Sequence, residues 1–153
     1  MCKSNRTLQA TPVHEAAGWT LSELLISLAL MAVLTAIALP AYNTQQSQAR
    51  RIDAQSALQQ LQLDQVRWRG THESYASDLN SLGWASENSP AGHYRIAIAD
   101  ASADGFTLTA TPLGAQARDT ICNPMRLQHL HTASVVLSSG ADLSTDTGRC
   151  WRQ

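Results

Sequence analysis

Residues 18–40 read GWTLSELLISLALMAVLTAIALP, and no other part of the chain constrains its architecture as strongly. The run from Trp19 to Leu39 is 21 residues long and almost wholly apolar, with Glu23 as its only charge. About 20 consecutive apolar residues are enough for a helix to cross the hydrocarbon core of a bilayer. The stretch therefore predicts a transmembrane helix at 19–39, and the residues after it have to build a small core of their own.

The polar segment before this run is predicted to be a cleaved leader. Residues 1–18, MCKSNRTLQATPVHEAAG, have no apolar core, whereas a secretory signal peptide carries its hydrophobic stretch before the cleavage site. A cut after Gly18 would instead leave the hydrophobic run on the mature chain, with Trp19 as its first residue. Lys3 and Arg6 favour a cytoplasmic leader, which places the following domain in the periplasm or outside the cell.

The residues around this cleavage point carry a specific resemblance. Residues 18–25, GWTLSELL, resemble the class III signal of type IV prepilins: glycine, a bulky apolar residue, Thr-Leu, and glutamate as the fifth residue of the mature chain. The resemblance implies that a prepilin peptidase cuts between Gly18 and Trp19 and methylates the Trp19 amine. It also implies that Thr20 and Glu23 act when the subunit assembles with other pilin subunits on the pilus assembly platform.

Glu23 is the residue in this run with the clearest physical argument. A charge at membrane depth costs roughly 2.5–3.5 kcal/mol on insertion scales, so it is expected to have a partner or a function. In type IV pilins the partner is the N-terminal amine of a neighbouring subunit, which sets the register of the incoming subunit. The alternative is a carboxylate near a helix end that reaches the interface or becomes protonated.

The helix is predicted to continue beyond Pro40 with a different character. Pro40 removes one backbone hydrogen bond and is expected to kink the helix, at the position where type IV pilins carry a helix-kinking proline. Residues 41–69 are rich in Gln, Ala, Leu and Arg, which are good helix formers. Apolar residues recur there on one stripe at helical spacing: Ala54, Ala57, Leu58, Leu61 and Trp68. The pattern predicts an amphipathic helix over 40–69 that Gly70 ends.

Residues 70–153 are predicted to form a small globular head. A loop at 70–93, with one helical turn at 77–82, precedes runs in which apolar residues alternate with small or polar ones. These strand-like runs are 93–99, 106–111, 125–130 and 134–137. They predict an antiparallel meander, and a helix packed on one sheet face is an economical cover for it. The fold class is therefore α+β, a pilin fold by resemblance, in which the long N-terminal helix packs on a small antiparallel sheet.

Two of the three cysteines are predicted to form a disulfide. Cys2 lies in the leader, which leaves Cys122 and Cys150 as a pair in a domain that is expected to be exported. They enclose 27 residues, and closing a loop of that length would add about 3–4 kcal/mol of stability. The enclosed segment is predicted to be a surface loop held by this cross-link.

The head also resembles a family. Residues 106–112, FTLTATP, then 116–119, QARD, then Cys122 and the ending Cys150-Trp151-Arg152 are similar to the head of PilE-type minor pilins, a head shared with ComP-like minor pilins that act as DNA receptors in transformation. The resemblance implies a minor pilin that is held in the inner membrane by one pass and then incorporated into an extracellular type IV pilus. Such subunits support pilus biogenesis, adhesion, twitching motility or DNA uptake.

A DNA receptor for natural transformation is a second hypothesis, with Arg118, Arg126 and Arg149 as candidate DNA contacts. Without residues 1–18 the chain has nine Arg, no Lys and eleven acidic residues, a net charge of −2. This charge opposes binding to a polyanion and predicts only weak binding to duplex DNA at physiological salt. In the structural alternative, the arginines pair with carboxylates such as Asp119. A third hypothesis is a type II secretion pseudopilin, which shares the same N-terminus.

The sequence shows no pattern typical of an enzyme. Nucleophile elbows, phosphate loops and paired catalytic acids are all missing from it, and its later histidines are scattered over loops and strands, at His72, His93, His129 and His131. His129 and His131 lie two residues apart and are expected to face solvent rather than to bind a metal. We therefore expect neither catalysis, nor a metal site, nor a cofactor.

Processing is directly testable by mass spectrometry of the protein isolated from its native membrane. The chain should begin at Trp19 and be heavier by one methyl group than its unmodified sequence. Gly18→Val should block this cleavage, because a branched side chain cannot enter a site shaped around glycine. An intact Met1, or a cut after Leu39, would contradict the prediction.

Overall fold

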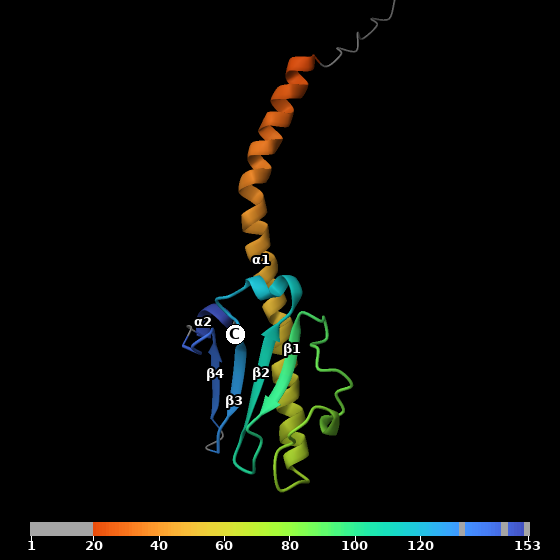
Figure 1. Cartoon of the computed structure of the whole chain (residues 1–153), viewed down its shortest axis with the longest axis vertical. Helices are drawn as coiled ribbons and strands as arrows, with labels where there is room; N and C mark the ends of the chain where they lie inside the picture. The colour runs from red at the N-terminus through yellow and green to blue at the C-terminus, as the bar shows by residue number, and fades with distance from the viewer. Residues whose placement is uncertain (1–19, 132–133, 145–146, 152–153) are drawn as a thin grey trace, which may run out of the picture. The chain divides into compact units, whose positions relative to one another are not determined.

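The computed structural model describes most of the chain: residues 20–131, 134–144 and 147–151. Figure 1 gives the labels of the helices and strands used below. The structure divides into two units between Pro40 and Ala41. Gly18 and Trp19, the predicted cleavage and methylation positions, lie outside the described residues.

Helix α1 (Leu21–Arg69) is 49 residues long, so Pro40 does not end it. Its first part contains an 18-residue window with a mean hydropathy of 2.4, none of which is buried. By length and composition this part of α1 can therefore cross a membrane. The helix ends immediately before Gly70, as predicted, whereas the kink at Pro40 stays a prediction.

The second unit contains a four-stranded antiparallel meander with the strand order β1-β2-β3-β4 (Figure 1). The strands are β1 (Tyr94–Ala99), β2 (Phe106–Pro112), β3 (Met125–His129) and β4 (Val135–Ser139). The alternating pattern therefore located all four strands, and the largest difference is that β4 extends to Ser139. A 3₁₀ turn, η1 (Asn80–Leu82), lies within the predicted helical turn.

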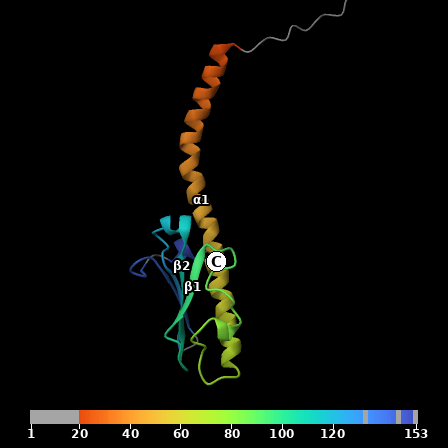
Figure 2. The ribbon, with the colours of Figure 1, turned by 45° about the vertical axis from the view of Figure 1, so that its right-hand side comes forward.

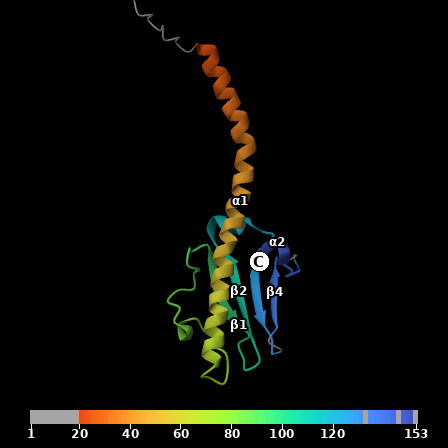
Figure 3. The ribbon, with the colours of Figure 1, turned by 180° about the vertical axis from the view of Figure 1, so that it is seen from behind.

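Residues 41–69 of α1 lie along one face of this sheet, as the views in Figures 2 and 3 show. Alternation along each strand directs one set of apolar side chains toward the helix. The largest fully buried hydrophobic side chains of the resulting core are Leu58, Leu61, Tyr94, Ile96, Phe106, Leu108, Met125 and Leu127. Ala54 and Ala57 are also fully buried, and their small side chains let the helix backbone approach the sheet.

The predicted apolar stripe of α1 is wrong at its last position. Trp68 is only half-buried and stacks on the ring of His72, with 3.6 Å between the ring centroids. Gln65 is the buried residue on the last turns of the helix instead. Its side-chain amide donates to the Ala76 carbonyl (2.7 Å) and accepts from the Ala76 N–H (2.9 Å), which satisfies its polar atoms inside the core.

The disulfide joins Cys122 to Cys150, with an S–S distance of 2.01 Å, as predicted. The segment that it encloses is not mainly a surface loop, because its described residues contain β3, β4 and the short helix α2 (Thr147–Cys150). These strands pair with each other and with β2, so Met125 and Leu127 belong to the core. The cross-link therefore fixes the C-terminal helix to the segment just before β3.

The head has two ends that are built from different elements (Figure 1). We call one the η2 end, where residues 43–51 of α1 lie beside η2 (Gly114–Arg118) and α2. We call the other the turn end, where α1 ends and where the β1–β2 and β3–β4 turns lie. The sheet runs between these two ends.

Candidate functional site

The start of α1 forms a capping box from the two residues predicted to act in assembly. The Thr20 N–H donates to Oε2 of Glu23 (2.9 Å), and the Glu23 N–H donates to Oγ1 of Thr20 (3.3 Å). The Thr20 hydroxyl also donates to the same Oε2 (3.0 Å). Two free N–H groups of the helix start are thereby satisfied within the chain. The Thr-x-x-Glu spacing in the sequence is a signal from which this cap could have been predicted.

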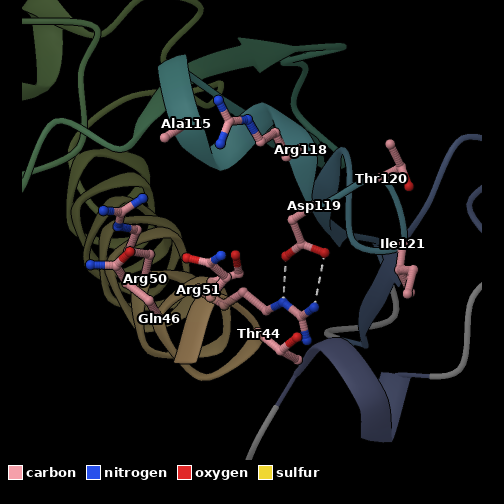
Figure 4. Close-up of a pocket in the computed structure, with 11 residues that line it drawn as sticks. Thr44, Gln46, Arg50, Arg51, Ala115, Arg118, Asp119, Thr120 and Ile121 are labelled. Carbon is pink, nitrogen blue, oxygen red and sulfur yellow. Dashed lines mark hydrogen bonds and ion pairs between the residues drawn. The ribbon is translucent and has the colours of Figure 1, made fainter. Parts of the chain in front are cut away.

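A buried ion pair organises the η2 end of the head. The Arg51 guanidinium donates from Nε to Oδ2 of Asp119 (2.6 Å) and from Nη2 to Oδ1 (2.9 Å), which is a two-pronged contact (Figure 4). The two side chains are only 10% and 5% exposed. Nη1 of Arg51 donates to the Arg149 carbonyl (3.1 Å), so the same side chain also holds α2.

Neutral side chains extend this polar network into the core. Nε2 of Gln116 lies 2.9 Å from the Tyr94 hydroxyl, 3.2 Å from Oδ2 of Asp119 and 3.1 Å from the Ser47 carbonyl. Burial raises the pKa of Tyr94 to about 12, so its hydroxyl stays neutral at physiological pH. Gln55 donates to the Cys150 carbonyl (2.8 Å) and adds a second link between α1 and α2.

A pocket of about 330 Å³ opens beside the ion pair, between residues 43–51 of α1 and the segment 115–121 (Figure 4). Arg50 and Arg118 line it, and neither forms an ion pair within the described part of the chain. Arg51 also lines it, but its charge is compensated by Asp119. The pocket therefore presents two uncompensated guanidinium groups together with amide and hydroxyl side chains.

The three arginines proposed as DNA contacts do not lie on one element. Arg118 is exposed at the end of η2, and Arg149 is exposed on α2. Arg126 lies in β3, where its neighbours across the sheet are Thr109 and Ser138. Its Nε is buried and has no hydrogen-bond partner among the described residues.

The sheet face that α1 leaves uncovered has an unusual composition. Its residues alternate with the core residues along the four strands, and they are Arg95, Ala97, Ala99, Thr107, Thr109, Thr111, Arg126, Gln128, Val136 and Ser138. We call this set the outward face. No strand residue on it is acidic, although the mature chain is expected to carry a net negative charge. The charged members of this set are two arginines.

The two late histidines behave differently from each other. His129 is half-buried and stacks on Phe106, with 5.2 Å between ring centroids, so the expectation that it faces solvent is wrong. His131 is exposed, as expected, and its Nδ1 lies 3.1 Å from a carboxylate oxygen of Asp104. The described residues contain no group of three or more His, Cys, Asp or Glu side chains placed to hold a metal ion.

A long apolar helix, its amphipathic continuation on an antiparallel meander, and a disulfide near the C-terminus together define a type IV pilin. Residues 40–126, more than half of the chain, match the family described as "Type IV minor pilin ComP, DNA uptake sequence receptor". The chain belongs to this family of type IV minor pilins. The family is one of structural pilus proteins.

The chain is also similar to a major pilin. It is 30% identical over 82 residues to "Type IV major pilin protein PilA" of Myxococcus xanthus (strain DK1622). The aligned region covers 54% of this chain and 37% of that protein, so the chain spans a little over a third of its relative's length. The N-terminal resemblance and the shared sequence agree on the class of type IV pilins.

Breaking the Arg51–Asp119 pair should cost much of the head's stability. Arg51→Met leaves a buried carboxylate unpaired, so urea unfolding of residues 41–153 should show a loss of roughly 3–5 kcal/mol. Arg51→Met combined with Asp119→Leu should recover most of this loss, because neither charge then remains buried. Arg95→Met is the matched control, since Arg95 lies 3.9 Å from Glu87 in a pair whose two side chains are 63% and 73% exposed, and it should lose at most about 1 kcal/mol. A loss in Arg51→Met no larger than in this control would contradict the role of the ion pair.

Proposed function

We propose that this chain is a minor subunit of a type IV pilus whose head takes part in DNA uptake. A prepilin peptidase would cut after Gly18 and methylate the Trp19 amine. Residues 19–39 would then hold the subunit in the inner membrane, with the head in the periplasm, until the assembly platform adds it to the filament. The family to which the chain belongs and the exposed apolar start of α1 support this proposal.

In this proposal Glu23 has two successive partners. Within the single chain its carboxylate oxygen Oε2 accepts from Thr20, which holds the carboxylate at the very start of the helix. In the filament the carboxylate would face the N-terminal amine of a neighbouring subunit, where the charge pair is strengthened by the low dielectric. Thr20 would act as a positioning residue for this contact, and Pro40 would kink the helix between its two parts.

The outward face is the observation that supports DNA contact. A net charge of −2 would repel DNA if the acidic residues were distributed evenly over the surface. None of the strand residues on the outward face is acidic, however. Arg126 has no carboxylate beside it on the strands, whereas Arg95 lies 3.9 Å from a carboxylate oxygen of Glu87 in an exposed pair. The threonine hydroxyls beside these arginines can donate hydrogen bonds to phosphate oxygens. The family to which the chain belongs is described as a DNA uptake sequence receptor, which agrees with this role.

Arg126 is the residue that we propose as the central contact. Its unpartnered Nε is one prong of a planar fork that matches the geometry of a phosphate group. Because this Nε is buried, a phosphate would reach it only after the side chain turns outward, and the contact would then give a partner to a donor that is costly to leave without one. Arg118 and Arg149 would add contacts from the η2 end.

Binding of duplex DNA by residues 41–153 tests this proposal. Arg126→Gln should weaken binding several-fold and reduce the slope of log K against log salt by about 1, as expected for one lost phosphate contact. Arg67→Gln removes the same charge near the end of α1 and should change neither quantity by as much. Undetectable binding of the wild-type head at low salt, or equal effects of the two substitutions, would contradict DNA contact through the outward face.

A further inference from the structure

The charges of the head are unevenly distributed between its two ends. At the η2 end the described surface cations are Arg50, Arg118 and Arg149, and none of them forms an ion pair with a described residue. Of the carboxylates near this end, Asp119 is paired with Arg51. Asp53 and Asp142 accept hydrogen bonds from neutral groups and keep their charges, so the three arginines outnumber these two carboxylates.

The turn end has the opposite charge. Its surface carboxylates are Glu73, Asp100 and Asp104, and all three are exposed. The cations there are fewer, because Arg67 is paired with Asp64, which leaves Arg69 and the histidines His72 and His131. The head is therefore positive at one end and negative at the other, although its net charge is close to zero.

The positive η2 end contains the residues of the head that directly follow the apolar segment in the sequence. Asn43 and Thr44, which line the cationic pocket, follow Leu39 by only four and five residues. Pocket residues from α1 thus come directly after the part of the helix that can cross a membrane. If residues 19–39 are in a bilayer, as the proposed function requires, the lipid headgroups are the first anions that this end of the head meets.

We propose that the η2 end binds the phosphate of anionic phospholipid headgroups while the subunit waits in the membrane. The pocket of about 330 Å³ lies at the lower end of the size range of small-ligand sites. Arg50 and Arg118 supply charge from two sides of it, and Asn43, Gln46 and Thr120 supply neutral polar groups. Basic residues just outside a spanning helix are attracted to anionic lipid surfaces.

The buried ion pair makes this surface possible. Arg51 and Asp119 neutralise each other inside the head, so the uncompensated charges that line the pocket are those of Arg50 and Arg118. Contact with headgroups would orient the head before assembly and would be given up when the subunit leaves the bilayer. This inference rests on the proposed membrane-inserted state and not on DNA binding.

Hydrogen exchange of the full chain in lipid nanodiscs tests the inference. Discs made of zwitterionic phosphatidylcholine alone are compared with discs that also contain anionic phosphatidylglycerol. Amides of residues 114–121 should exchange several-fold more slowly in the anionic discs. The variant with Arg50→Gln and Arg118→Gln should lose this difference, whereas the matched variant with Arg67→Gln and Arg95→Gln should keep it. Unchanged protection of β2 and β3 confirms that each variant is folded, and Arg118→Gln alone gives a milder second variant.

Several outcomes would overturn the inference. Equal exchange of 114–121 in both kinds of disc would exclude the lipid contact while leaving the pilus proposal intact. Failure of the chain to enter the discs would overturn the membrane-inserted state and this inference together. Slower exchange on adding inorganic phosphate to zwitterionic discs would show that a free anion suffices, and the same effect from duplex DNA would assign the site to DNA.

Discussion

The bidentate contact between Arg51 and Asp119 is the interaction on which the architecture of the head depends. The two residues are 68 positions apart in sequence, and their side chains bring α1 and η2 together at the edge of the core. Burying two charges is costly, and the cost is offset only when their remaining hydrogen-bonding groups are satisfied. Here the Arg149 carbonyl and the side-chain nitrogen of Gln116 add hydrogen bonds around the pair, so one contact also positions α2 and β1, although Oε1 of Gln116 has no partner among the described residues.

This constraint links the fold to the surfaces that the subunit offers to partners. With α1 held against one sheet face, the other face is left free for ligands, and its strand residues carry arginine and threonine without any acid. Because Asp119 is paired with Arg51 inside the head, it does not compensate the arginines at the η2 end, which remains positive. The disulfide reinforces the same corner, since Cys150 is held both by Cys122 and by the amide of Gln55. A small core thus leaves two distinct polar surfaces for function.

Local pattern was enough to predict most elements of this fold. The apolar run, the helix formers after Pro40 and the alternation in the four strands each act over a few residues, so they are visible in the sequence. Contacts between residues far apart in the sequence could not be predicted in this way. Nothing near Arg51 in the sequence indicates that Asp119 is its partner, and the helical spacing does not show that Gln65 rather than Trp68 enters the core. The same holds for the outward face, because the position of Arg126 beside Thr109 depends on strand register. The Thr20–Glu23 capping box is different, since its spacing could have been recognised from the sequence.

Whether this chain is a subunit of a type IV pilus is decided by its content in sheared pili. The wild-type protein should be recovered with the filaments. Glu23→Ala should be processed and found in the inner membrane at a normal level, because removing an intramembrane charge lowers the cost of insertion. It should nevertheless be missing from the pili, because it cannot attract the N-terminal amine of a neighbour. Wild-type protein that never enters pili would contradict its role as a pilus subunit, and entry of Glu23→Ala at the wild-type level would remove Glu23 from the assembly contact.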